Sequence, residues 1–199
     1  MRAQRKCKKS DEITRIVNES ILMSKAVIEK RVKEIEIIAE LIIKAYKSGG
    51  KVLLFGNGGS AADAQHIAAE LVGKFALKRR AFPAIALTTN SSLLTAVAND
   101  YGYRNVFSRQ VEALAGDKDV VIAISTSGGS ANVIKAIKVA RLIGALTVGL
   151  TGGDGGILAS VVDVALIVPS KCTPRIQEAH ILIGHIICEL VEEELVGST

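Results

Sequence analysis

The sequence has no tryptophan, and aromatic residues make up only 4% of its 199 residues. Apolar residues nevertheless make up 49%, so isoleucine, valine, leucine and alanine must fill the core. Such aliphatic cores are typical of parallel sheets that helices cover. No apolar run approaches the roughly 18–20 residues of a bilayer-spanning helix, so we expect no membrane partner. A signal peptide is not expected either, because Met1–Lys9 leads into Ser10-Asp11-Glu12 rather than an apolar segment.

Cysteine is also scarce. Cys7, Cys172 and Cys188 form an odd set without CxxC spacing. This pattern argues against a disulfide framework and against a cysteine-based zinc site, and it favours a reducing, cytoplasmic location. Cys188 lies in an apolar stretch, so we expect it in the core.

The basic charge is confined to one end of the chain. The first nine residues carry five lysines and arginines and no acid, whereas the remaining 20 basic residues match the 20 acidic ones. We therefore expect residues 1–10 to be a disordered basic tail and residues 11–199 to form one domain. Nucleic acid is not an expected partner, because no basic stripe is evident on the neutral body.

The apolar pattern predicts an α/β fold. Over residues 11–48, isoleucine, valine and leucine recur at helical spacing, which predicts two helices, or one long helix with a break, before Gly49-Gly50. Apolar strands then alternate with helical segments, which predicts a doubly wound parallel sheet with ligands at the carboxyl ends of its strands. The expected strands are Val52–Phe55, Ala84–Leu87, Val120–Ile124, Thr147–Leu150 and Val164–Val168. The expected helices are Ser60–Lys74, Ser91–Val97, Val106–Ala115, Ser130–Ile143 and Pro174–Leu195.

The glycine-rich turn Gly56-Asn57-Gly58-Gly59-Ser60 follows the first strand and opens a helix. Free N–H groups and the helix dipole at such a turn favour an anion. The helix then presents His66 and Glu70, four residues apart, on one face. The pair could serve acid–base chemistry or bind a metal, and the alternative is a surface ion pair or a buried histidine. Because the glycines do not give GxGxxG in register, we expect no nucleotide cofactor.

A second loop, Ser125-Thr126-Ser127-Gly128-Gly129-Ser130, joins a strand to a helix. Hydroxyl and backbone N–H groups at a helix N-terminus suit a phosphate monoester. The loop is not a P-loop, because the Gly-Lys-Ser/Thr ending is missing. The alternative is ordinary helix capping, with Ser130 as the N-cap.

The last helix and one short segment supply further candidates. His180 and His185 are five residues apart, about 140° around a helix, so they should not serve one site. Gln177 and His185 diverge less, and His185 is the likelier functional histidine because it lies deeper in the apolar stretch. Asn99-Asp100 could close the edge of a site or could simply end a helix.

Together these motifs resemble the phosphoheptose isomerases, a family of the sugar isomerase (SIS) superfamily. The resemblance covers about residues 11–195, with the motifs in order and at matching spacing. It rests on Gly56–Ser60, His66, Glu70, Asn99-Asp100, Ser125–Gly128, Ser130-Ala131-Asn132, Arg175–Glu178 and His185. It implies a three-layer α/β sandwich with a five-stranded parallel sheet, and a homotetramer built on the N-terminal helices with active sites at subunit interfaces.

The resemblance also implies a reaction and a set of residues. Sedoheptulose 7-phosphate would become D-glycero-D-manno-heptose 7-phosphate through an enediol, the first step toward the heptose of bacterial surface polysaccharide such as lipopolysaccharide. Glu70 would be the base and His185 the partner acid–base. The phosphate would be held by Ser125, Thr126, Ser127 and Ser130. The sugar would be held or enclosed by Asn57, Gly58, Gly59, Ser60, Asn99, Asp100 and Gln177.

Some members of the family bind zinc through the residues that match His66, Glu70, Gln177 and His185, so the resemblance implies one zinc ion per subunit. A zinc-bound glutamate is a poorer base, because the cation lowers its proton affinity. Either the metal shifts during turnover, or it holds the site while another arrangement transfers the proton.

Lys74 departs from the family pattern, which has an arginine there in many members. Lysine keeps the positive charge but loses the bidentate fork, which affects subunit contacts or phosphate approach more than the chemistry. Two rival functions remain. One is a related tetrameric scaffold that binds the bacterial replication initiator, but that relative lacks the residues matching Glu70 and His185. The other is a SIS protein for a different sugar phosphate, against which the whole-length match counts.

Overall fold

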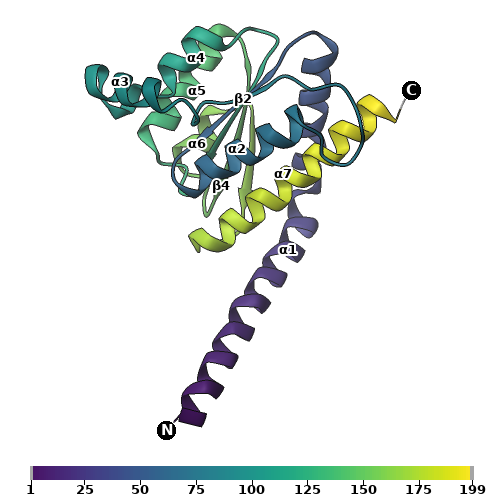
Figure 1. Cartoon of the computed structure of the whole chain (residues 1–199), viewed down its shortest axis with the longest axis vertical. Helices are drawn as coiled ribbons and strands as arrows, with labels where there is room; N and C mark the ends of the chain where they lie inside the picture. The colour runs from purple at the N-terminus through teal and green to yellow at the C-terminus, as the bar shows by residue number, and fades with distance from the viewer. Residues whose placement is uncertain (1, 198–199) are drawn as a thin grey trace.

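The computed structural model describes residues 2–197, with side chains described from Lys8 onward. Five parallel strands form one sheet in the order β2-β1-β3-β4-β5, and helices cover both faces (Figure 1). The strands are β1 Val52–Gly56, β2 Ala84–Ala86, β3 Val120–Ser125, β4 Leu146–Gly152 and β5 Val164–Val168. The helices are α1 Arg2–Lys47, α2 Gly59–Val72, α3 Ser91–Tyr101, α4 Ser108–Leu114, α5 Ala131–Ile143, α6 Gly156–Val161 and α7 Thr173–Val196, with a 3₁₀ turn at Tyr103–Asn105. The predicted three-layer α/β sandwich is thereby confirmed.

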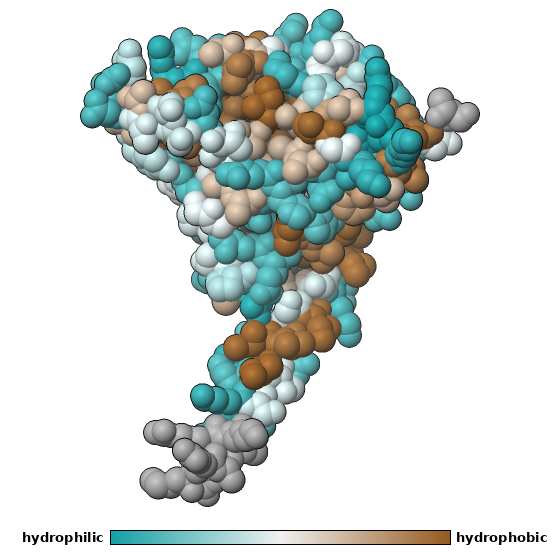
Figure 2. All heavy atoms as spheres, viewed as in Figure 1, coloured by the Kyte–Doolittle hydropathy of each residue, from teal (hydrophilic) through white to brown (hydrophobic). Residues whose placement is uncertain are grey.

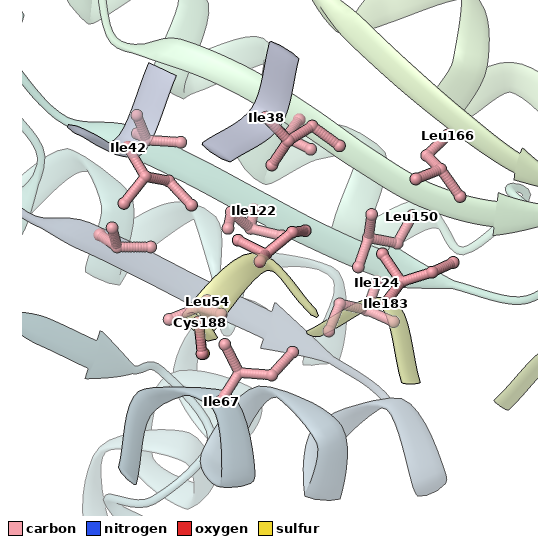
Figure 3. Packing of buried hydrophobic residues seen from close by; sticks show 14 of the residues in the cluster. Ile38, Ile42, Leu54, Ile67, Ile122, Ile124, Leu150, Leu166, Ile183 and Cys188 are labelled. Carbon is pink, nitrogen blue, oxygen red and sulfur yellow. The ribbon is translucent and has the colours of Figure 1, made fainter. Parts of the chain in front are cut away.

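Strand side chains alternate between two apolar clusters, one on each face of the sheet. Leu54 and its same-face neighbours pack against α1, α2 and α7, and Figure 3 shows Ile38, Ile67 and Ile183 meeting them. Leu53 and Phe55 point to the other face, which α4, α5 and α6 cover. Both faces are therefore dry, as the near-continuous apolar strands predicted.

Helix α1 differs from its prediction in two ways. It runs unbroken from Arg2 to Lys47, where we expected two helices or a break. It also includes most of the basic segment 1–10 that we expected to be disordered, whereas Met1 lies outside the described residues. Residues 2–47 contain neither glycine nor proline, and extending a helix costs far less than nucleating one. The division into a tail and one domain over 11–199 stays a prediction.

The two halves of α1 have different environments. The C-terminal half packs on the sheet and α7 through buried residues such as Ile35, Ile38 and Ile42. The N-terminal half projects away from the body (Figure 1) and leaves Ile13 62% and Leu22 64% exposed. An apolar face without a covering element indicates an interaction surface.

Other expectations hold with small shifts at the ends of elements. Helix α6 was missed, because its six residues are too few to display helical periodicity. Cys188 is buried as predicted, and burial raises the pKa of its thiol to about 12. Within residues 2–197, no helix combines the length and apolar character needed to cross a membrane.

Candidate active site

The carboxyl ends of β1, β3, β4 and β5 lie at one edge of the sheet, and the loops that follow them form the candidate site. This is the edge at which open parallel sheets bind ligands. Helices α2 and α7 run side by side along one face (Figure 1), and α2 leads from the first loop back toward the amino ends of the strands, where the carbonyl of Leu71 accepts the N–H group of Phe82 just before β2.

The first loop, residues 56–60 between β1 and α2, is held tightly against α7. Gly58 has a φ of +58°, a conformation that side chains disfavour. A Cβ at Gly59 would lie 2.4 Å from Nε2 of Gln177, so glycine leaves room for the Gln177 amide against the start of α2. Gln177 thus lies at the start of α2, next to the loop. Ser60 is only 3% exposed, which leaves its hydroxyl little access to a ligand from solvent.

Two reciprocal hydrogen bonds between side-chain amides join Asn57 to Asn132 at the start of α5, the helix that follows the second loop. Nδ2 of Asn57 donates to Oδ1 of Asn132 at 3.0 Å, and Nδ2 of Asn132 donates to Oδ1 of Asn57 at 2.9 Å. The Tyr103 hydroxyl donates to the same Asn57 oxygen at 3.2 Å. Sequence reasoning assigned no role to Asn132 or Tyr103. Asn132 was visible in the motif, whereas nothing local pointed to Tyr103.

The second loop keeps hydrogen-bonding groups open. Ser125 is buried, and its Oγ lies 3.2 Å from Oγ of Ser130. Ser130 occupies the N-cap position of α5 but makes no side-chain cap bond, which contradicts the capping alternative in part. Ser127 is exposed at the tip. In the first turn of this 13-residue helix the Val133 N–H group is bonded to Oδ1 of Asn132, whereas those of the two residues before Val133 are uncapped; together with the hydroxyls they suit an anion.

A cavity of about 240 Å³ adjoins this loop, between the ends of β3, β4 and β5. Thr126 and Ser127 line it, as expected for ligand-binding residues. Its other walls were not named as site residues from the sequence, although parallel strands predict ligands at this edge. They are Gly152, Gly153, Asp154, Ser170, Lys171, Thr173 and Ile176.

Three titratable side chains meet where α2 and α7 pack together. Nε2 of His66 lies 3.2 Å from Oε1 of Glu70 and 2.9 Å from Nε2 of His185. One ligand atom from each of the three can be chosen so that all lie within 4.8 Å of one another. Tetrahedral zinc holds two nitrogens about 3.4 Å apart, so a shift of a few tenths of an ångström would admit the ion. Two imidazoles and a carboxylate are a known ligand set for catalytic zinc.

Asp63 lies one turn before His66 and was not singled out from the sequence. Burial raises the pKa of Asp63 to about 6, and the nearby His66 partly offsets that rise. Its Oδ2 is buried and has no hydrogen-bond partner among the described residues. The i, i+3, i+7 spacing of Asp63, His66 and Glu70 was a signal that could have revealed it.

His180 does not join this cluster, as its helical angle predicted. It is fully buried, and its Nε2 lies 3.1 Å from the carbonyl oxygen of Thr151. A carbonyl only accepts, so we infer that Nε2 carries the proton. Burial lowers the pKa of His180 to about 4, although the bond to Thr151 opposes that shift. His180 is therefore a neutral core residue.

Asn99 and Asp100 lie in the last turn of α3, where the helix-end alternative put them, and their role at the edge of a site stays a prediction. Nδ2 of Asn99 donates to Oδ1 of Asp100 at 2.8 Å, and both residues are exposed. In the described part of the chain no hydrogen bond joins them to the two loops. Lys74, which departs from the family pattern, is exposed just beyond α2.

Comparisons with known proteins bear on the fold and the family of this chain. The family model for the SIS domain matches residues 17–152. The phosphoheptose isomerase of Clostridium acetobutylicum is 59% identical over 166 residues, which is 83% of this chain and 85% of the relative. That of Aquifex aeolicus is 54% identical over 92% of this chain and 96% of its own length. The solved phosphoheptose isomerase of Neisseria gonorrhoeae superimposes with a TM-score of 0.88 at 44% identity, covering 92% of this chain and 98% of that one.

Proposed function

This chain belongs to the phosphoheptose isomerase family of SIS-domain proteins and is an aldose–ketose isomerase; we propose that its substrate is sedoheptulose 7-phosphate and its product D-glycero-D-manno-heptose 7-phosphate. The observation that supports this most is the cluster of His66, Glu70 and His185, in a chain whose second loop keeps anion-binding groups open. A ketose phosphate needs both features, a phosphate anchor and an acid–base pair.

In this proposal the phosphate binds the second loop at the start of α5. The hydroxyls of Thr126, Ser127 and Ser130 donate to it, together with N–H groups of the first turn. Ser125 acts mainly by orienting Ser130, since its own side chain is buried. The sugar chain then extends toward α2 and is held or enclosed by Asn57, Gly58, Gly59, Asn99, Asp100 and Gln177, while buried Ser60 supports the loop.

We assign the proton transfer to Glu70 and His185. Glu70 is 26% exposed, so its carboxylate is open to a substrate yet partly shielded from water. As base it takes the proton from C1 of the ketose and returns it to C2 by way of an enediol. His185 exchanges a proton with the hydroxyl and carbonyl oxygens, and its contact with His66 fixes which ring nitrogen does so.

We further propose that His66, Glu70 and His185 hold one zinc ion, with the amide oxygen of Gln177 as a fourth ligand. Bound zinc would polarise the carbonyl and hydroxyl oxygens of the sugar. Bound zinc would also lower the proton affinity of the Glu70 carboxylate, so zinc binding and base action at Glu70 would oppose each other. Metal analysis of protein purified without chelator tests this: well below one ion per subunit contradicts it.

A homotetramer is the proposed assembly. The projecting half of α1 carries an apolar face that nothing else in the described residues covers, and Figure 2 shows it as a brown band on the stalk. The face consists of Ile13, Ile16, Val17, Ile21, Leu22, Ile28 and Val32. Other copies of α1 would bury it in a helical bundle. Light scattering after size-exclusion chromatography should give about four times the 21.0 kDa chain mass; a monomer contradicts the proposal.

Cytoplasmic synthesis of the heptose precursor of surface polysaccharide is the proposed physiological role. The decisive experiment incubates the protein with sedoheptulose 7-phosphate and follows aldose formation, with and without zinc. Glu70→Gln should lower turnover about 10²- to 10⁴-fold. Glu112→Gln is the matched control, because Glu112 is 61% exposed on α4 and pairs only with nearby Arg109.

Turnover by wild type and its loss in Glu70→Gln alone supports the isomerase and the assigned base. A folded wild-type protein without turnover contradicts the proposal. It would favour the scaffold alternative, which a binding assay with the replication initiator then tests.

A further inference from the structure

A buried ion pair lies beside the active site and contacts both elements that carry it. Arg79 is in the loop between α2 and β2, and Glu192 is near the end of α7. The Nε of Arg79 donates to Oε1 of Glu192 at 2.7 Å, and the two side chains are 3% and 2% exposed. Neither residue was singled out from the sequence, and the proposed reaction does not use either.

Glu192 fastens the loop that follows α2 onto α7. Its two carboxylate oxygens accept the backbone N–H groups of Phe75 at 3.1 Å, Ala76 at 2.6 Å and Leu77 at 2.7 Å. Burial alone would raise the pKa of Glu192, but these three donors and Arg79 lower it below its usual value. Glu192 is therefore an ionised, fully hydrogen-bonded carboxylate in the interior.

Arg79 joins the same loop to the end of α2 through hydrogen bonds. Its two terminal nitrogens donate to the carbonyl oxygens of Leu71 and Glu70, each at 2.9 Å. These carbonyls belong to the last turn of α2, where helical partners are missing. The guanidinium also lies 4.0 Å over the ring of Phe82, which fixes its plane. The turn that presents the Glu70 side chain is thus held directly by Arg79.

The loop reaches the other catalytic residue as well. Phe75, whose N–H group Glu192 accepts, has its ring 5.7 Å from the imidazole of His185 at an angle of 46°. One buried pair therefore restrains Glu70 through its backbone and His185 through an aromatic contact.

Stability alone is a weak reason for such a pair. Desolvating two charges costs about as much as their attraction returns, and apolar replacements of similar volume often stabilise a protein equally well. The geometry offers a better reason, because a small displacement of a catalytic group costs about 10²-fold in rate.

We propose that Arg79 and Glu192 are positioning residues, whose buried pair sets the separation of Glu70 on α2 and His185 on α7. This inference rests on the proposed function, since it assigns the pair a role in that reaction. The pair itself does not touch the substrate.

The test uses Glu192→Gln and Arg79→Lys. Glu192→Gln keeps the shape but removes the charge and one acceptor oxygen. Arg79→Lys keeps the charge but cannot bond Glu192 and both carbonyls together, because lysine lacks the fork. Each should lower kcat about 10- to 100-fold with KM changed less than threefold, since the phosphate loop is remote from the pair. If Glu192→Gln does not fold, Arg79→Lys carries the test.

Asp119→Asn is the matched control for lost stability. Asp119 is another buried carboxylate that accepts two backbone N–H groups and a cation, but its partners are Lys51 and Gly116, which belong neither to α2 and α7 nor to the loop that carries Arg79. The Asp119→Asn variant should unfold more easily than wild type, while its kcat stays within twofold of the wild-type value.

A second readout is independent of activity. The chain has three histidines, so ¹⁵N-histidine labelling gives three imidazole spectra. Both test variants should shift the signals of His66 and His185 and leave that of buried His180 in place, whereas Asp119→Asn should shift none. Loss of stability with unchanged kcat and unchanged histidine signals overturns the proposal.

The spectra also separate this inference from the proposed function. If wild-type protein fails to isomerise sedoheptulose 7-phosphate, yet the variants shift the two histidine signals, the function fails and the positioning role stands. If wild type is active and the signals do not move, only the positioning role fails.

Discussion

The two edges of the sheet use similar polar residues in opposite ways. At the amino ends of the strands, Asp119 accepts N–H groups from Lys51 and Gly116 and the Lys51 ammonium, at 2.6–2.9 Å. There Asp163 likewise accepts the N–H and hydroxyl groups of Thr147. At the carboxyl ends, Ser127 is exposed and the helix after it has no side-chain cap.

The difference separates stability from function. Groups at the amino edge are satisfied internally, so they stabilise the fold and have nothing left for a ligand. Groups at the carboxyl edge are left open, which costs stability and supplies binding capacity. Mutations at the two edges should therefore have opposite consequences for stability and for catalysis.

Removing a catalytic group should separate function from stability most clearly. His185→Ala should lower turnover about 10²- to 10⁴-fold, because the partner acid–base is lost. Its imidazole is partly exposed, so the circular dichroism spectrum and the melting temperature should stay close to wild type. Steady-state kinetics beside thermal melts measures both, and near-normal turnover would contradict the assignment.

The pH dependence of the free energy of unfolding in His180→Gln tests whether His180 is a purely structural residue. Its pKa is about 4 in the fold and about 6.5 when unfolded, so only the unfolded chain gains a proton between these values. Stability is thus present above pH 6.5 and lost as the pH falls toward 4, by about 3 kcal/mol. The free energy of unfolding, measured with urea across that pH range, should change less in His180→Gln than in wild type.

Asp63 acts in the opposite direction over much of the same range. Its raised pKa means that the fold retains a proton that the unfolded chain has lost, so its contribution falls as the pH rises from about 4 to 6. The difference between wild type and His180→Gln, rather than either profile alone, therefore isolates His180. An unchanged difference across pH 4–6.5 would contradict its neutral, buried state.

At the amino edge we expect the reverse result, a loss of stability with unchanged kcat. Asp119→Asn should lower the free energy of unfolding by about 2 kcal/mol, since charge-assisted hydrogen bonds are lost from a buried carboxylate. The kcat measured well below the melting temperature should match wild type. A fall in kcat without unfolding would show that the two edges are coupled.

Asn132→Ala should have the smallest effect. It removes the two amide bonds that hold Asn57, each worth about 1 kcal/mol, so the loop loses order rather than a reacting group. We expect KM for the sugar phosphate to rise about tenfold with kcat within a few-fold. A large fall in kcat with unchanged KM would instead place Asn132 in the chemistry.

Much of the fold and part of the site could be predicted from the sequence. The strand bounds were right to within two residues at each end, since apolar runs and glycine turns are local signals. The cluster of His66, Glu70 and His185 was expected only through the family resemblance, because nothing local relates residues 119 positions apart. Tyr103 was missed for the same reason, whereas Asp63 and Asn132 had local signals that were not used.

The sequence by itself determined the order of the elements, the parallel sheet and the edge at which its loops gather, because periodicity and turn residues act over short range. Only the tertiary structure decided which polar groups are satisfied. Glu192 resembles any helical glutamate in the sequence, and its burial beside Arg79 depends on how α7 packs against the loop after α2. Such long-range packing decides whether a charged residue is solvated, structural or positioned for chemistry.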